Sequence, residues 1–205
     1  MAGTILVSTA YLPPVGYFSL LNKSDVALIE KEENYTKQTY RNRCYILSAN
    51  GAQMLTVPVL EGSFHKTAIK DICIDYSKRW QQVHLRAINA SYRSSPYFDF
   101  YYDDIERVIM ANPKFLLDLN FELLSFLIGA LKINTHIKYT EHFEPVVNDK
   151  NDYRYLLTPK NDSFKNTMPY RQTFTFESGF VQGLSVIDLL FNMGTDSALF
   201  LSQGK

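Results

Sequence analysis

Hydrophobic and polar positions follow two different periods along this chain, and each period predicts one kind of element. Short apolar runs bounded by polar or turn-forming residues predict strands in the first part of the chain. We expect strands at residues 4–10, 25–30, 43–48 and 53–59, a shorter strand at 72–74, and a short helix at 16–22. The dipeptide Asn50-Gly51 separates the third strand from the fourth and favours a hairpin turn.

The middle of the chain has a helical period instead. Residues 78–93 predict an amphipathic helix, because the residues of one face recur at helical spacing. That face holds Trp80, Val83, His84, Ala87, Ile88 and Ser91. Pro96 ends this helix, and residues 99–111 predict the next one. Residues 114–132 are apolar on nearly every side, which predicts a central buried helix.

The last part of the chain changes character. Residues 148–168 are rich in Asn, Asp and Lys and lose all periodicity, which predicts a long polar surface loop. Residues 172–176 then predict a strand, and residues 185–191 predict a helix. Ser185 and Asp188 have the spacing of a helix cap, and capping explains Asp188 without any function.

Together these elements predict an α/β or α+β fold, in which helices pack on a mixed sheet. The chain of 205 residues is long enough for one well-buried core. We therefore expect a single domain over residues 1–205, while the order of the strands does not follow from the sequence.

Charge and composition narrow the possible partners. The formal net charge is zero and the isoelectric point is about 6.9, which argues against nucleic acid and against an anionic membrane surface. No apolar run approaches the roughly 18 residues of a transmembrane helix, and we read no signal peptide. Cys44 and Cys73 form neither a disulfide framework nor a ligand pair, so we expect a cytoplasmic protein.

Common catalytic motifs do not occur in the sequence. It has no G-x-S-x-G elbow, no Walker loop and no G-x-G-x-x-G. The four histidines, which are His65, His84, His136 and His142, do not stand at metal-ligand spacing. We therefore expect no metal and no cofactor.

His84 is the best titratable candidate for catalysis. It lies one turn after Trp80 and one turn before Ile88, on the inward face of its predicted helix. A histidine there could act as a general acid or base near neutral pH. The alternative is a buried neutral histidine that is hydrogen-bonded to the backbone or to a tyrosine.

Polar residues also gather between positions 34 and 43. Lys37 and Arg43 suit an anion such as phosphate, and the amide of Asn42 suits hydroxyl groups. This mixture favours a carbohydrate or a phosphorylated sugar over an apolar ligand. The alternative is a solvated strand edge with ordinary ion pairs to Glu30, Glu32 and Glu33.

An aromatic and proline-rich turn over residues 11–18 follows the first strand directly. Prolines end strands, and ligands collect at the carboxyl ends of strands in α/β sheets. We expect Tyr11 and Tyr17 to be exposed or half-exposed on this turn, where they could pack on a ligand. The alternative is that both rings close one end of the core.

Taken in order, these motifs resemble the WbqC-like protein family. They are Tyr11-Leu12-Pro13-Pro14-Val15-Gly16-Tyr17-Phe18, Asp25-Val26, Asn34-Tyr35, Lys37, Asn42-Arg43, Leu55-Thr56-Val57-Pro58-Val59, Trp80, His84, Tyr92, Pro96-Tyr97-Phe98, Tyr170-Arg171-Gln172 and Leu184-Ser185-Val186-Ile187-Asp188-Leu189-Leu190-Phe191-Asn192. The resemblance leaves out residues 140–168. Members of the family place a His-Gln-Pro-Asn-like stretch before the first tyrosine, where this chain has Val7-Ser8-Thr9-Ala10.

The resemblance implies a role in bacterial O-antigen or other surface-polysaccharide biosynthesis. One hypothesis is a transferase that modifies a nucleotide-linked sugar. Lys37 and Arg43 would then hold phosphate, while Tyr11 and Tyr17 would pack on the sugar or base and His84 would be the general base. Asn42 and Trp80 would complete the substrate site.

The alternative is a non-catalytic sugar-binding or assembly protein of the same pathway. A purely structural role for these residues is also open. Either function implies a small-molecule sugar or nucleotide-sugar ligand, and a homo-oligomer is compatible with both.

Overall fold

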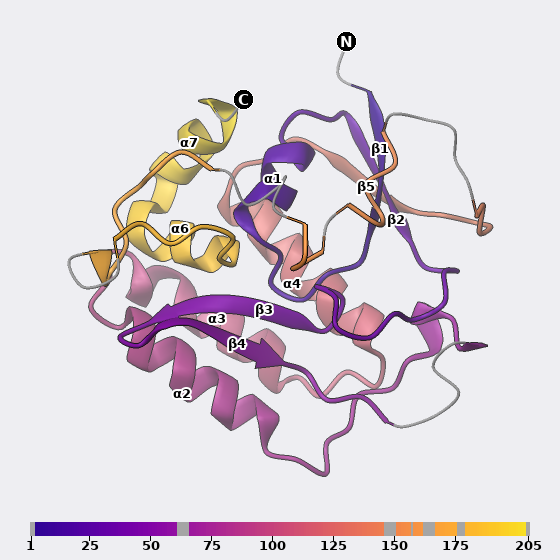
Figure 1. Cartoon of the computed structure of the whole chain (residues 1–205), viewed down its shortest axis with the longest axis horizontal. Helices are drawn as coiled ribbons and strands as arrows, with labels where there is room; N and C mark the ends of the chain where they lie inside the picture. The colour runs from indigo at the N-terminus through magenta and orange to yellow at the C-terminus, as the bar shows by residue number, and fades with distance from the viewer. Residues whose placement is uncertain are drawn as a thin grey trace.

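The strands of the fold form two separate β units (Figure 1). The computed structural model describes residues 3–60, 66–145, 151–156, 158–161, 167–175 and 179–203. One unit is a three-stranded parallel sheet, and the other is a two-stranded antiparallel hairpin. Helices pack around both units, so the predicted α/β class with mixed strand pairing is confirmed.

The parallel sheet brings three strand ends to one edge. Its order is β1-β2-β5, with β1 at Thr4–Ser8, β2 at Val26–Glu30 and β5 at His136–Tyr139. Ser8 pairs with Glu30 in the register of β1 and β2, and Ile29 pairs with Tyr139 across β2 and β5. Since all three strands run the same way, Ser8, Glu30 and Tyr139 lie at the same carboxyl edge.

The hairpin forms where the sequence predicts it. Strands β3 (Arg43–Ser48) and β4 (Gly51–Thr56) pair antiparallel, with the turn at Ala49 and Asn50 and with Gly51 opposite Ser48 as the first residue of β4. Gly51 adopts a φ of +95°, a conformation that side chains other than glycine rarely take. The predicted strand at 72–74 is reduced to two isolated bridges, from Cys73 to Phe115 and from Ile74 to Val59.

The helices follow the predicted helical periods closely. They are α1 (Val15–Leu21), α2 (Trp80–Tyr92), α3 (Phe98–Met110), α4 (Leu116–Ala130), α6 (Val186–Met193) and α7 (Ser197–Gln203), with 3-10 turns η2 (Ile69–Asp71) and η4 (Gly194–Asp196). The sequence did not predict β5 or α7. Within the described ranges, each helix is too short or too polar to cross a bilayer.

Helix α4 buries most of its surface, as its apolar composition predicts. Leu119, Leu123 and Leu127 are fully buried in the hydrophobic core. A narrow stripe that includes Asp118 and Glu122 remains exposed. The helix is therefore buried on most sides rather than on all of them.

The turn over residues 11–18 faces inward. Tyr11 is 0% exposed and Tyr17 is 1% exposed, so the expectation of exposed tyrosines was wrong. The turn is held against the start of α6, because Val15 N donates to the Leu184 carbonyl and Val186 N donates to the Pro13 carbonyl. This pairing turns the tyrosine rings into the core.

The described part of the predicted loop at 148–168 contacts the sheet. Leu6 N donates to the Asn151 carbonyl at 3.0 Å, and Tyr153 N donates to the Leu6 carbonyl at 2.8 Å. The segment therefore adds a short parallel bridge to the free edge of β1, and it carries the fully buried Arg154 into the molecule.

Residues 172–175 form a turn where the sequence predicted a strand. Thr175 accepts a hydrogen bond from Gln172 N and donates one to the Gln172 carbonyl, which closes the turn. The prediction of a strand is therefore wrong for these residues, and Phe176 lies outside the described residues.

Candidate functional site

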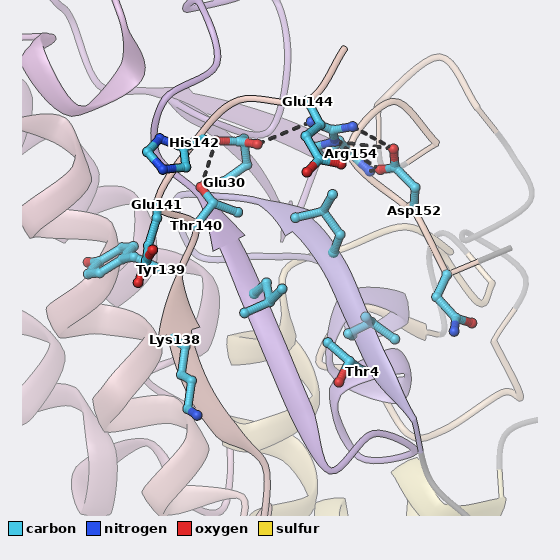
Figure 2. Close-up of a pocket in the computed structure, with 14 residues that line it drawn as sticks. Thr4, Glu30, Lys138, Tyr139, Thr140, Glu141, His142, Glu144, Asp152 and Arg154 are labelled. Carbon is cyan, nitrogen blue, oxygen red and sulfur yellow. Dashed lines mark hydrogen bonds and ion pairs between the residues drawn. The ribbon is translucent and has the colours of Figure 1, made fainter. Parts of the chain in front are cut away.

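A pocket of about 470 Å³ opens over the parallel sheet and reaches its carboxyl edge (Figure 2). This volume is within the range of small-molecule sites. Parallel α/β sheets place their ligands outside the carboxyl ends of the strands. The described residues that line the pocket are Thr4, Ile5, Leu6, Leu28, Glu30, Lys138, Tyr139, Thr140, Glu141, His142, Glu144, Asn151, Asp152 and Arg154.

The lining combines an apolar floor with a polar rim. Leu6 and Leu28 come from the strands, while most of the charged groups gather at the strand ends and on the segments that follow; Thr4 and Lys138 lie farther back, on β1 and β5 (Figure 2). Four carboxylates face two cationic side chains among the described lining residues. The pocket therefore carries an excess of hydrogen-bond acceptors and of negative charge.

Glu30 is the buried anchor of this edge. Its Oε1 accepts from Thr140 Oγ1 at 2.7 Å and from Glu32 N at 2.8 Å, and its Oε2 accepts from Arg154 at 3.1 Å. The side chain is 1% exposed. A buried carboxylate with this many partners is held in one orientation.

Arg154 links Glu30 to the segment that covers the sheet edge. Its guanidinium also donates to both carboxylate oxygens of Asp152, at 3.0 and 2.7 Å. Burial raises the pKa of Asp152, but the bonds from Arg154 outweigh burial and bring that pKa below its usual range. The rings of Phe143 and Tyr155 each lie 5.4 Å from the guanidinium carbon, which fixes the side chain further.

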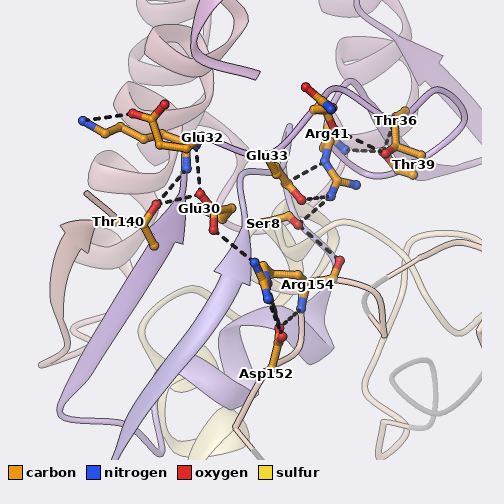
Figure 3. Close-up of polar contacts among 12 residues, drawn as sticks. Ser8, Glu30, Glu32, Glu33, Thr36, Thr39, Arg41, Thr140, Asp152 and Arg154 are labelled. Atoms are coloured by element: carbon orange, nitrogen blue, oxygen red, sulfur yellow. Dashed lines mark hydrogen bonds and ion pairs between the residues drawn. The ribbon is translucent and has the colours of Figure 1, made fainter. Parts of the chain in front are cut away.

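A second buried ion pair continues the network behind the edge (Figure 3). Arg41 donates to both carboxylate oxygens of Glu33, at 2.9 and 2.6 Å, and to Ser8 Oγ at 2.7 Å. Ser8 Oγ in turn donates to the Arg154 carbonyl at 3.2 Å. One polar chain therefore ties the end of β1 to both buried arginines.

The side chains at the rim are free to meet a ligand. Lys138, Glu141, His142 and Glu144 are exposed and line the pocket. Burial and the nearby carboxylates of Asp118 and Glu122 raise the pKa of Tyr139 to about 12. The Tyr139 hydroxyl therefore keeps its proton at neutral pH and can donate a hydrogen bond.

Three of the predicted site residues, Tyr11, Trp80 and His84, lie together away from the carboxyl-edge pocket. Tyr11 Oη lies 2.9 Å from His84 Nδ1, and the Trp80 ring packs edge-on against His84 at 5.1 Å. Burial lowers the pKa of His84 to about 4, although a hydrogen bond with the Thr56 backbone favours the charged form. His84 is therefore a neutral ring at physiological pH, with bonds to Tyr11 and Thr56.

The remaining predicted residues are dispersed. Tyr17 Oη donates to the Ser8 carbonyl, and Asn42 Nδ2 donates to the Val57 carbonyl. Lys37 is exposed and Arg43 is half-buried at the start of β3. Neither of these cations is among the described residues that line the groove beside His84 or the pocket at the carboxyl edge. Their predicted roles stay predictions.

Val7-Ser8-Thr9-Ala10, which stand where the resembled family has a His-Gln-Pro-Asn-like stretch, lie at the end of β1. Ser8, Thr9 and Ala10 line a cavity of only about 10 Å³ together with Tyr17 and Arg41. A cavity of that size has room for about one water molecule. Tyr17 therefore lies beside a packed interior rather than beside a ligand-sized space.

Sequence reasoning missed most of the carboxyl-edge network. Glu30 had a usable signal, since it is an acid directly after a buried apolar strand. Arg154 had none, because it lies in a polar segment without periodicity. Among the described residues, no group of three or more His, Cys, Asp or Glu side chains could hold a metal ion. His65 lies outside the described residues.

Asp188 belongs to a further buried polar cluster. Its Oδ2 accepts from Tyr170 Oη at 2.6 Å and from Gln172 Nε2 at 3.1 Å. Burial raises the pKa of this carboxyl to about 6, against the opposing effect of the hydrogen bonds. Ser185 caps α6 as predicted, by accepting from Ile187 N at 3.4 Å.

Fold and pocket together define an α/β protein with a ligand-sized pocket at the carboxyl edge of a small parallel sheet. A family model described as the WbqC-like protein family matches residues 9–161, which is more than half of the chain. The chain belongs to the WbqC-like protein family.

The chain is also similar to a curated protein of Mycobacterium tuberculosis (strain ATCC 25618 / H37Rv), named as uncharacterized protein Rv1507c. The two sequences are 27% identical over an alignment of 228 positions, which covers 98% of each chain. No solved structure matches the chain.

Proposed function

We propose that this protein is a cytoplasmic enzyme of bacterial surface-polysaccharide biosynthesis, and that it modifies a nucleotide-linked sugar by group transfer. We further propose that residues 1–205 act as one WbqC-like domain. Membership in the family supports the pathway, through the association of that family with O-antigen and surface-polysaccharide genes. The observation that carries the ligand class is the pocket at the carboxyl edge of the sheet.

The chemistry of the pocket suits the sugar part of such a ligand. Exposed Glu141 and Glu144 can accept hydrogen bonds from hydroxyl groups, and Lys138 can donate to ring or hydroxyl oxygens. Leu6 and Leu28 supply an apolar surface for the carbon skeleton. The excess of carboxylates disfavours the diphosphate at this place, because like charges repel.

Group transfer to a sugar needs a base for the accepting hydroxyl or amine. Glu141, His142 and Glu144 stand at the exposed rim, where they can reach a bound ligand. His84 remains the base that the sequence predicts, and in that role it would have to release its bond to Tyr11 or to Thr56. The two possibilities differ in which pocket the sugar occupies.

A non-catalytic sugar-binding or assembly protein is the second candidate. The specific observation in its favour is that Glu30, Asp152 and Arg154 bond to one another, so the buried charged groups of the pocket are already paired. Only the exposed rim would then contact the ligand. Such a protein would bind the sugar without changing it.

Isothermal titration calorimetry with a panel of nucleotide-linked sugars, followed by mass spectrometry of each mixture, tests the proposal. We expect at least one member of the panel to bind the wild-type protein. We expect Glu141→Gln combined with Glu144→Gln to weaken that binding by about tenfold, the effect of a difference of about 1.4 kcal/mol. Asp103→Asn, an exposed acid on α3 that does not line the pocket, is the control and should bind as the wild type does.

Mass spectrometry then separates the two candidates. A change in the mass of the sugar in the presence of a donor supports the enzyme. Binding without any change across the donors tried supports the non-catalytic protein. If no member of the panel binds, or if the double variant binds as tightly as the wild type, the carboxyl-edge pocket is not the sugar site.

A further inference from the structure

A second hollow lies between strand β4 and the start of helix α2, which run side by side in Figure 1. Its volume is about 300 Å³, and it shares no lining residue with the carboxyl-edge pocket. Its charged lining is of the opposite sign, because Lys78 and Arg79 contribute two cations and no described lining residue is acidic. This hollow is called the α2 groove below.

Positive charge at the start of α2 is unusual in its setting. A helix N-terminus is itself the positive end of the helix dipole, so cations there are normally unfavourable. Arg79 is the N-cap residue of this helix of 13 residues, makes no side-chain cap, and no acid occurs in the first turn. Asp75 offsets part of this charge, since the positive charge of Lys78 is among the causes that lower the pKa of Asp75.

Two residues that line the groove carry buried polar atoms that lack a partner among the described residues. Trp80 lines the groove and is 5% exposed, yet its indole Nε1 donates to no acceptor among the described residues. Thr56 lines the groove as well, and its Oγ1 is equally without a partner there.

Buried donors without acceptors are rare in folded proteins and cost stability. An anion at this place would accept hydrogen bonds from the first-turn amides of α2 and from the two exposed cations, and the buried, unpartnered indole N–H of Trp80 would become a further donor once the ring turns toward the groove. Each of these is a donor, and together they match the helix-terminus sites that bind phosphate. We propose that the α2 groove binds a phosphate-type anion, either free or as the phosphate of a nucleotide.

The proposal goes beyond the sugar pocket and does not depend on it. It gives Trp80 a defined role, as a hydrogen-bond donor to an anion rather than a ring that stacks on a sugar. It also gives His84, which borders the same groove, an anionic neighbour that would favour its protonated form.

Trp80 is the single tryptophan of the chain, so tryptophan fluorescence reports on this groove alone. The experiment is a titration of the full-length protein with inorganic pyrophosphate and, separately, with uridine diphosphate, each against sodium chloride at matched ionic strength. We expect a saturable change in Trp80 fluorescence with both phosphate ligands and none with chloride. Tighter binding of the nucleotide would identify a nucleoside phosphate as the ligand, and equal binding would identify the free anion.

The test variant and its control both replace exposed residues, which tolerate substitution. Lys78→Ala combined with Arg79→Ala should raise the dissociation constant of pyrophosphate by about tenfold or more, since each cation provides a charge-assisted contact. Arg107→Ala, which removes an exposed cation on α3 outside the groove, should leave that dissociation constant unchanged.

The proposal is overturned by any of three results. These are the absence of a saturable change, a change of the same size with chloride, or unchanged affinity in the variant that lacks Lys78 and Arg79. None of them affects the sugar pocket, whose test uses Glu141 and Glu144. Failure of one site is therefore distinguishable from failure of the other.

Discussion

Glu30 and Arg154 show at the scale of single residues how the carboxyl edge is held. Both are buried, at 1% and 0% exposed, and each is the partner of the other. Removing one member of a buried ion pair strands the other charge in the interior, and that typically costs about 3–5 kcal/mol. The pair therefore fixes the geometry of the pocket even though its net contribution to stability is small.

Replacing Arg154 by Ala should destabilise the protein by about 3–5 kcal/mol, because Glu30 is then buried without its cation. Urea denaturation of the single variants and of the Glu30→Gln, Arg154→Ala double variant measures this cost. We expect a coupling energy of about 2 kcal/mol between the two sites. Arg107→Ala, which breaks an exposed pair with Asp104, should cost no more than about 1 kcal/mol. Additive single effects would show that the buried pair does not act as a unit.

Asp188 should make stability depend on pH in an unusual direction. Its pKa is about 6 in the folded protein against an ordinary value of 3.8, so the folded state holds the proton more tightly. The protonated carboxyl therefore stabilises the folded state. This contribution is fully present below pH 3.8 and is lost as the pH rises through about 6.

The free energy of unfolding of the wild type, relative to Asp188→Asn, should therefore fall by about 3 kcal/mol across this window. Denaturant melts of both proteins at a series of pH values measure the difference. A difference that stays constant with pH would mean that the carboxyl of Asp188 titrates normally.

His84 should produce the opposite slope. Its pKa is lowered from 6.5 to about 4, so its contribution to stability is complete above 6.5 and is lost as the pH falls toward 4. The relative stability of the wild type and His84→Gln, measured by the same melts, should shift in favour of the variant as the medium becomes acidic. NMR titration of the His84 ring provides a direct check, and a pKa near the ordinary value would contradict the buried, neutral ring described above.

The sequence predicted the placement of a residue only where a local pattern, such as helical spacing, determined it. The helical spacing of Trp80 and His84 placed both on one face, and the structure puts their rings in contact. The partnership of Arg154 with Glu30 spans 124 positions of the chain, and no local pattern encodes such a contact. Tyr11 and Tyr17 were misjudged because the pairing of their turn with the start of α6 is also a long-range event.

Among the elements, those with a strong local signal were predicted well. The dipeptide Asn50-Gly51 marks the hairpin, where Asn50 lies in the turn and Gly51 begins β4, and α2, α3 and α4 have clear helical periods. Strand β5 was missed because its four residues alternate between exposed and half-buried positions and resemble a polar linker. Its place at the edge of the sheet comes from pairing with β2, which is a tertiary effect.

Two glycines allow the connections between elements to be tested as a pair. Gly51 has a φ of +95° and open space where a Cβ would be, so Gly51→Ala should cost about 1–3 kcal/mol through the backbone alone. Gly194 ends α6 with a φ of +54°, and a Cβ there would lie 2.5 Å from the Tyr97 ring. Gly194→Ala should therefore lower the midpoint of thermal unfolding more than Gly51→Ala does, as measured by circular dichroism. Equal losses would show that the Tyr97 ring moves away at little cost.

The molecule as a whole joins its distant segments at the parallel sheet and at the start of α6. The segment at 151–154 bridges β1, and the turn at 11–18 pairs with residues 184–186. Sequence patterns predicted the α/β class and most of the helices and strands but not the meeting of these segments. For that reason the pocket was found at the carboxyl edge of the sheet, beside Glu30 and Arg154, rather than at Tyr11 and Arg43.

NMR chemical-shift mapping with a nucleotide-linked sugar that binds would locate the ligand on the intact protein. We predict that the backbone amides of Thr140, Glu141 and His142, at the end of β5, shift in proportion to occupancy, together with those of Leu28 and Glu30 on β2. Binding that leaves these amides unmoved, and shifts only residues elsewhere, would contradict a sugar site at the carboxyl edge of the sheet.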